Sequence, residues 1–139
     1  MIHVVKLSVG SESVEGLAAW QRGPARGPDG RARHVTRMWP RRAADVLSGG
    51  SVYWVIRGAI LCRQRILGFE EVRREDGIPR CAFVLDPLLV PVAATPRRPF
   101  QGWRYLAAGD APADVDADRA AEAPLPPALS VALAEIGLL

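Results

Sequence analysis

Arginine and aromatic side chains alternate in one short segment late in the chain. The segment places Arg97, Arg98 and Arg104 around Phe100 and Trp103. Because guanidinium groups bind phosphates and aromatic rings stack on unpaired bases, this mixture is typical of surfaces that hold single-stranded nucleic acid. The alternative is that the two aromatic residues belong to the core and that the arginines only face water.

A second basic stretch, residues 22–42, holds seven arginines and a single acidic residue. Arg41 and Arg42 directly follow Pro40, which is expected to be the first residue of a helix, so their charges oppose the helix dipole. An anion site, where backbone N–H groups and guanidinium groups converge on a phosphate, would explain this placement. Alternatively, Arg41 pairs with Asp45 and the rest is a solvated loop.

Two neighbouring expected strands carry further candidates. Because side chains alternate along a strand, Tyr53 and Arg57 share one face of the first strand, and Arg63 and Arg65 share a face of the next. These four side chains could extend a binding surface if the opposite faces are buried. Exposed arginines on strands are nevertheless common without any function.

Signals for catalysis or for metal binding are few. His3 and His34 have no metal-ligand spacing, and Cys62 lies in an apolar run where a thiol is expected to be buried and inert. The chain has no nucleophile, phosphate-loop or paired-carboxylate motif. We therefore predict no metal and no cofactor. An enzyme would have to rely on a pocket in which Tyr53 or Glu71 moves a proton.

Hydrophobic periodicity and turn residues predict the elements that position these side chains. The first half of the chain is expected to hold a strand at 3–9, a helix from the cap Ser11 to Arg22, a Gly/Pro loop at 23–31 and a helix beginning at Pro40. Two hairpins follow: one of 52–57 and 60–69 that turns at Gly58-Ala59, and one of 69–74 and 80–85 that turns at Asp76-Gly77. The last expected element is a strand or ordered aromatic segment at 100–106. Consecutive hairpins favour an α+β domain built on a small curled antiparallel sheet or open β-barrel with flanking short helices.

Charge divides the chain into a basic body and an acidic end. Residues 1–109 hold 17 basic and 9 acidic side chains, whereas residues 110–139 hold 1 basic and 6 acidic side chains. We expect a body at 1–109, an acidic linker at 110–126 and a C-terminal helix at 127–139 that packs on the body. The acidic end is interpreted as a plain linker, with competition against a nucleic acid as the alternative. With no export signal and no apolar run of the roughly 20 residues that span a bilayer, a cytoplasmic protein is expected.

Three segments together resemble a bacterial domain family of unknown function: residues 34–40 (HVTRMWP), 50–58 (GSVYWVIRG) and 97–106 (RRPFQGWRYL). Residues 49–58, which follow a short expected helix, are also similar to the corresponding strand of PUA, ASCH and EVE-like barrels. That resemblance implies a PUA-like barrel that binds RNA or modified bases. Ser51 stands where those domains often have an acidic residue, and the lysine of the hydrolytic members is missing, so no hydrolysis is implied.

The favoured function is binding of a nucleic acid, RNA first and including a modified or flipped base, or of another polyanion. The first alternative is an enzyme acting on a nucleotide-like small molecule, and the second is a protein-interaction module. The chain is expected to be a monomer or a homodimer that does not contact a membrane. The predicted site consists of three kinds of residue. Six would hold phosphates, namely Arg37, Arg41, Arg42, Arg97, Arg98 and Arg104, and three would stack on bases, namely Trp39, Tyr53 and Trp103. Arg57 and Gln101 complete the predicted nucleic-acid-binding residues.

Overall fold

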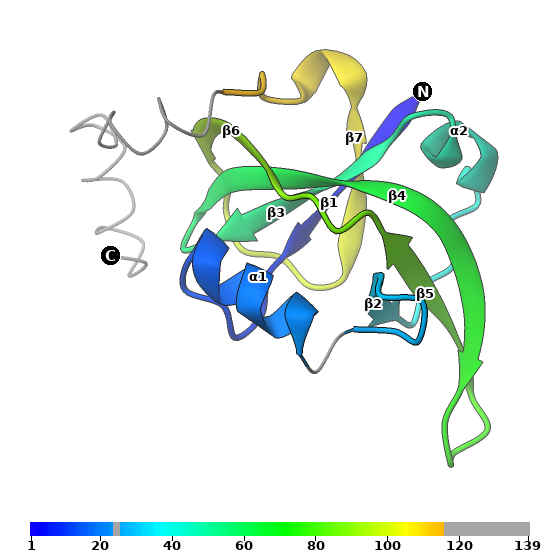
Figure 1. Cartoon of the computed structure of the whole chain (residues 1–139). Coiled ribbons are helices and arrows are strands. Elements are labelled where there is room, and N and C mark those ends of the chain that lie inside the picture. Colours follow the sequence, from blue (N-terminus) through cyan, green and yellow to red (C-terminus); the bar gives the residue numbers. More distant parts are fainter. Residues whose placement is uncertain (24–25, 116–139) are drawn as a thin grey trace.

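The computed structural model describes residues 1–23 and 26–115, and one β-sheet organises them (Figure 1). The fold is α+β: seven strands and two short α-helices occur in this part of the chain. In chain order the elements are β1 (Ile2–Leu7), α1 (Val14–Arg22), β2 (Ala32–Thr36), α2 (Ala43–Leu47), β3 (Ser51–Ile56), β4 (Ala59–Arg73), β5 (Pro79–Leu85), β6 (Val90–Pro96), β7 (Trp103–Ala107) and the 3-10 turn η1 (Ala108–Asp110).

The sheet is mixed and open, which corrects the prediction of a purely antiparallel curled sheet or barrel. Its strand order is β2-β5-β4-β3-β1-β7, with β6 paired to the first part of β4. β1 runs parallel to β3, and the remaining pairs are antiparallel. A parallel pair needs a long crossover, here the chain through α1, β2 and α2. Local hairpin signals do not reveal such a pairing.

Both predicted hairpins are confirmed, with one change in a turn. β3 and β4 are joined by Arg57 and Gly58, one position earlier than predicted. The loop between β4 and β5, residues 74–78, contains the predicted Asp76 and Gly77, and the N–H of Gly77 closes its turn on the carbonyl oxygen of Arg74. Two strands were missed. β2 is a short edge strand, and β6 contains Pro91 and Pro96, which lack the N–H group that a central strand needs.

The two helices begin later than predicted. The hydroxyl of Ser13, not of Ser11, caps α1 by accepting the N–H of Gly16 at 2.9 Å. α2 begins after Arg42, so Pro40 is not its first residue. The ion pair on α2 joins Arg42 and Asp45 at 3.0 Å, in place of the predicted pair between Arg41 and Asp45.

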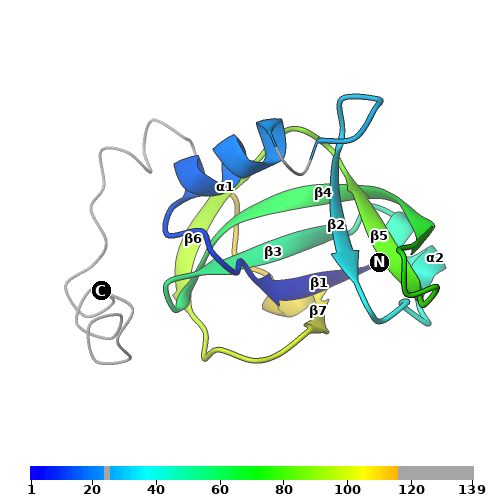
Figure 2. The same cartoon turned by 90° about the horizontal axis from the view of Figure 1, so that it is seen from below.

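Alternation along the strands divides the buried side chains into two clusters. The larger cluster includes Val4, Val52, Trp54, Phe83 and Trp103 and receives Leu17 from α1. Figure 2 shows α1 lying over the sheet beside β2, with β1, β3 and β4 running alongside one another. The smaller cluster lies on the other face and consists of Val5, Tyr53, Val55, Ile60, Val92 and Leu106.

A buried amide network ties α1 to the sheet. Gln64 of β4 is fully buried, and its Oε1 accepts the indole N–H of Trp54 at 3.1 Å and the Nε2–H of Gln21 at 2.7 Å. Its Nε2 donates to Oε1 of Gln21 at 2.6 Å and to the carbonyl oxygen of Asp86 at 2.7 Å. Because every polar atom of this side chain has a partner, its burial carries no desolvation penalty from an unmade bond.

The predicted linker and C-terminal helix are only partly within the described residues. Residues 113–115 lie along β6, where the N–H of Ala93 donates to Ala113 and the N–H of Val115 donates to Pro91. The rest of the predicted linker and the helix at 127–139 lie outside the described residues. Neither α1 nor α2 has the length and apolar character that crossing a membrane requires.

Candidate functional site

The β3–β4 turn and the loop between β6 and β7 lie side by side, because the N–H of Arg97 donates to the carbonyl oxygen of Gly58 at 2.8 Å. This contact brings five of the predicted site residues into one region. We call this region the basic surface, and its predicted residues are Arg57, Arg97, Arg98, Gln101 and Arg104. Of these only Arg97 is half-buried, and the others are exposed.

Phe100 organises the basic surface. The guanidinium carbon of Arg104 lies 4.9 Å from the centre of its ring, and that of Arg97 lies 5.5 Å away. The ring itself is half-buried against the smaller buried cluster. Cation–π contacts of this kind contribute about 0.5–1 kcal/mol at exposed sites. Phe100 therefore contacts two cations, Arg97 on the irregular loop after β6 and Arg104 on β7.

The arginines of the basic surface form no ion pair with a carboxylate of residues 1–23 and 26–115. Within residues 1–23 and 26–115, the arginines that form ion pairs are Arg33, Arg42, Arg63, Arg73 and Arg80. None of the four arginines of the basic surface is among them. Their positive charge is therefore available to an external anion.

Arg57 occupies a strained backbone position at the centre of the β3–β4 turn. Its φ is 52°, and it is the one non-glycine residue in the described ranges with a positive φ. Gly58 follows with a φ of 82°, so two successive residues have the left-handed conformation of a type I′ hairpin turn. Asn or Gly is the usual residue at the first of these positions. An arginine there is therefore in a conformation that costs backbone strain.

Four of the other predicted residues form a second, separate group around the connection from β2 to α2. Arg37, Trp39, Arg41 and Arg42 are exposed there, and the Trp39 ring packs at a tilt on Phe69, 6.1 Å between centres. Arg42 pairs with Asp45, lies 5.9 Å from the Tyr105 ring and donates its backbone N–H to the Tyr105 hydroxyl. Because side chains alternate along β7, Tyr105 and Arg104 lie on opposite faces. The two groups thus belong to different sides of the sheet.

Two of the predicted stacking residues are buried, which corrects their proposed role. Trp103 is 5% exposed and its indole N–H donates to the carbonyl oxygen of Met38 at 3.0 Å. Tyr53 is 4% exposed and belongs to the smaller buried cluster. Neither ring offers a face to a nucleobase. Trp39, which is 47% exposed, is the predicted stacking residue whose ring remains accessible.

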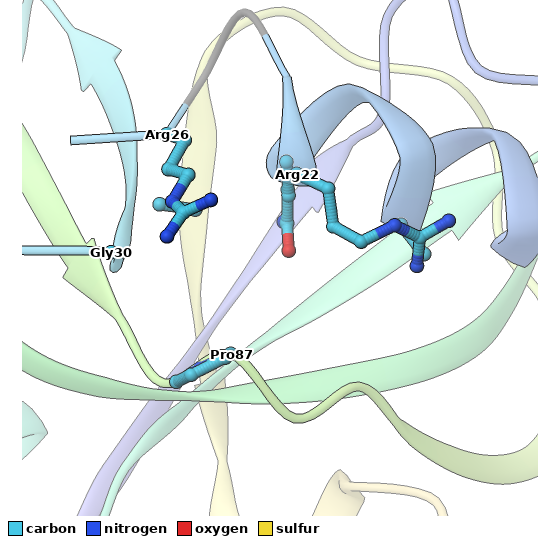
Figure 3. A pocket seen from close by; sticks show the side chains of 7 residues that line it. Arg22, Arg26, Gly30 and Pro87 are labelled. Atoms are coloured by element: carbon cyan, nitrogen blue, oxygen red, sulfur yellow. The ribbon is translucent and has the colours of Figure 1, made fainter.

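A hollow of about 210 Å³ between α1 and the loop before β2 was not predicted (Figure 3). Arg22 and Arg26 stand at its sides, and Gly30 and Pro87 line it further in. Figure 3 shows Arg26 reaching down toward Pro87, whereas Arg22 extends along α1. Both arginines belong to the basic stretch at 22–42, so the sequence signalled their charge but not the hollow.

The two buried cysteines stay protonated rather than poised for nucleophilic chemistry. Burial raises the pKa of the Cys62 thiol to about 12 and that of Cys81 to about 11, so both stay protonated, as expected for Cys62. No three His, Cys, Asp or Glu side chains in the described ranges are grouped so that they could hold a metal ion.

A family model described as "Protein of unknown function (DUF1489)" matches residues 4–139. No curated protein and no solved structure matches the chain. These comparisons do not link the chain to PUA, ASCH or EVE-like barrels.

Proposed function

The chain belongs to the DUF1489 family, whose description assigns no function, and we propose from its surface chemistry that it binds single-stranded nucleic acid, RNA first, through the basic surface. The observation that carries this proposal is the set of four arginines without an ion pair within the described residues, two of which rest on Phe100. Guanidinium groups held in this way can bind successive phosphates without first losing an internal partner.

Contacts to phosphates are expected to dominate binding, with little base recognition. Trp103 and Tyr53 are buried, and the ring of Phe100 already contacts Arg97 and Arg104. Base stacking contributes about 1–3 kcal/mol per base where a ring is free, but the exposed tryptophans of the described residues, Trp20 and Trp39, are not part of the basic surface. We therefore expect a strong dependence on salt and a weak dependence on sequence.

The shape of the basic surface favours a single strand over duplex DNA. The major groove of B-DNA admits an α-helix or a free two-stranded ribbon. Neither helix carries the basic surface, and the β3–β4 hairpin is flanked by β1 and β6 in the sheet. A flexible single strand can instead follow the arginines of the turn and the loop.

The proposal is tested by fluorescence anisotropy with single-stranded RNA, single-stranded DNA and duplex DNA at two salt concentrations. The test variant is Arg97→Ala/Arg104→Ala. Its matched control is Arg73→Ala/Arg74→Ala, which removes the same charge near the β4–β5 turn, at the opposite end of β4. Figure 1 shows this turn projecting away from β6.

The wild-type chain should bind single-stranded RNA with an affinity that falls steeply as salt rises. Losing two phosphate contacts should reduce the slope of log affinity against log salt by about 1.4, since each contact to a single strand contributes about 0.7. The control variant should keep most of the wild-type slope. Absence of binding at low salt, or equal losses in the two variants, would contradict the proposal.

A further inference from the structure

A second hollow, of about 410 Å³, lies at the start of β3, at the other end of that strand from the basic surface. It is bounded on one side by β1, β3 and β4 and on the other by the segment that follows β7. Its lining residues of chemical interest are His3, Tyr53, Arg63, Arg65 and Asp114. We call it the Tyr53 hollow.

Strand register brings these side chains together from distant parts of the sequence. Tyr53 of β3 lies opposite Arg63 of β4, and Ser51, two residues earlier on β3, lies opposite Arg65. His3 of β1 lies beside Ser51 and meets the Tyr53 ring edge-on, with 5.0 Å between the ring centres. Because alternate residues point to the same face, all of them project into one side of the sheet.

His3 presents a hydrogen-bond donor to the Tyr53 hollow. Its Nδ1 accepts the N–H of Ser51 at 3.0 Å, so the proton of the neutral ring lies on Nε2. Burial, and then the positive charge of Arg63, lower the pKa of the imidazole below its ordinary value. At neutral pH the ring is therefore uncharged, and its Nε2–H, which makes no hydrogen bond with residues 1–23 or 26–115, can donate to a ligand.

Tyr53 adds a second donor. Its hydroxyl makes no hydrogen bond with the described residues, although the residue is 4% exposed. Burial raises the pKa of the phenol, so the hydroxyl keeps its proton. A protonated hydroxyl at the wall of a hollow can donate to a ligand oxygen.

Two guanidinium groups complete the lining. Arg63 donates to both carboxylate oxygens of Asp114 at 2.7 Å and to the hydroxyl of Ser51 at 3.1 Å. A guanidinium has five N–H donors, so Arg63 keeps further donors after these bonds. Arg65 is exposed and forms no ion pair within residues 1–23 and 26–115. Since Asp114 is already bound to Arg63, the lining presents donors and a net positive charge.

We propose that the Tyr53 hollow binds the phosphate group of a small organic phosphate, with Arg65, Tyr53 and His3 as its donors. Fixed donors that converge from several strands suit a tetrahedral oxyanion better than a flat carboxylate. The volume falls within the range of small-molecule sites and exceeds the needs of a bare phosphate ion. Ala108, Ala111 and Pro112, which line the hollow without charge, contact the organic part of the ligand. This site is distinct from the basic surface and does not depend on it.

Isothermal titration calorimetry on the full chain tests the site with adenosine 5′-monophosphate and ribose 5-phosphate, with inorganic phosphate and with adenosine. Both phosphate esters should bind, inorganic phosphate should bind more weakly, and adenosine should not bind. Because adenosine 5′-monophosphate contains a base and ribose 5-phosphate does not, comparing the two esters separates recognition of the phosphate from recognition of a base. In NMR spectra of the full chain, the backbone amide resonance of Ser51, whose N–H donates to His3, should shift when an ester binds.

Arg65→Gln should weaken binding about tenfold or more, since hydrogen bonds to charged groups are the stronger class. Tyr53→Phe, which removes one hydroxyl and keeps the ring, should weaken it severalfold. Arg74→Gln, an exposed arginine near the β4–β5 turn, is the matched control and should bind as wild type. Arg97→Ala/Arg104→Ala should also leave ester binding unchanged, which separates this site from the basic surface. Equal affinity in wild type and Arg65→Gln, or equal binding of adenosine and its monophosphate, would overturn the proposal.

Discussion

His34 illustrates how the fold sets the chemistry of a single side chain. The ring lies on β2 and meets Trp54 and Phe83 edge-on, with centres 5.1 and 6.3 Å apart. Its Nε2 is buried and has no hydrogen-bond partner within the described residues. Burial, and then the nearby charge of Lys6, lower the pKa of the imidazole to about 4. Burial, with the charge of Lys6, therefore keeps this histidine neutral at neutral pH.

The stability of the fold should fall as the pH drops from 6.5 to about 4. In the unfolded chain His34 takes up a proton near pH 6.5, whereas in the folded chain it does so only near 4. The unfolded state thus binds more protons in this window, and stability that is present above pH 6.5 is lost below it. The shift corresponds to up to about 3 kcal/mol, since one pKa unit is about 1.4 kcal/mol.

Urea unfolding at pH 7 and pH 4.5 measures this loss, with His34→Phe as the comparison because a phenyl ring keeps the aromatic contacts. The variant should lose clearly less stability on acidification than the wild type. Part of the pH dependence of stability should remain in the variant, because the pKa of His3 is also lowered by folding. The same acid-induced loss in both proteins would show that His34 does not titrate in this window.

At the scale of elements, the β3–β4 turn links stability to the proposed binding. Its second residue must be glycine or a residue that tolerates positive φ, and Gly58 meets that need. Its first residue, Arg57, does not. The turn forms nevertheless, because β3 is buried along its whole length and is paired with β1 on one side and with β4 on the other.

Arg57→Asn should stabilise the protein and weaken RNA binding at the same time. Asn tolerates the left-handed region better than arginine does, so the free energy of unfolding should rise by about 0.5–1 kcal/mol. Loss of one guanidinium from the basic surface should lower the affinity for single-stranded RNA at low salt. Urea unfolding and anisotropy check the two effects. A variant with wild-type affinity would remove Arg57 from the proposed interface.

At the scale of the whole molecule, the basic body and the acidic end carry opposite charge. Residues 116–139 hold four acidic side chains and one basic side chain. An acidic segment covalently attached to a basic body lowers the effective attraction for an external polyanion, and salt screens that effect. The charge pattern is therefore expected to moderate binding rather than to shape the fold.

A chain that ends at Val115 should bind single-stranded RNA more tightly than the full chain at low salt. This end point keeps residues 113–115, which hydrogen-bond to β6. The difference should shrink as salt rises, since screening acts within about 10 Å at 0.1 M salt. Anisotropy measures the affinities and circular dichroism checks that the shorter chain folds. Equal or weaker affinity of the folded shorter chain would show that the acidic end does not compete with RNA.

Local patterns in the sequence were sufficient to locate the hairpins. The turn residues Gly58 and Asp76-Gly77, together with the β-branched and aromatic runs around them, predicted β3, β4 and β5 closely. The same local reading placed a strand near residue 103 and a buried, inert Cys62. These features depend on neighbouring residues, whose types are sufficient to determine backbone conformation and approximate burial.

The arrangement of the candidate sites required the tertiary structure. Alternation along β7 showed that Trp103 and Arg104 lie on opposite faces, but which face is buried depends on the layers packed against it. The contact of Arg97 with Gly58 and the parallel pairing of β1 with β3 join segments far apart in the chain. Types and spacing of residues therefore determined which side chains were available for chemistry. Long-range strand pairing, which no local periodicity encodes, decided which of them meet.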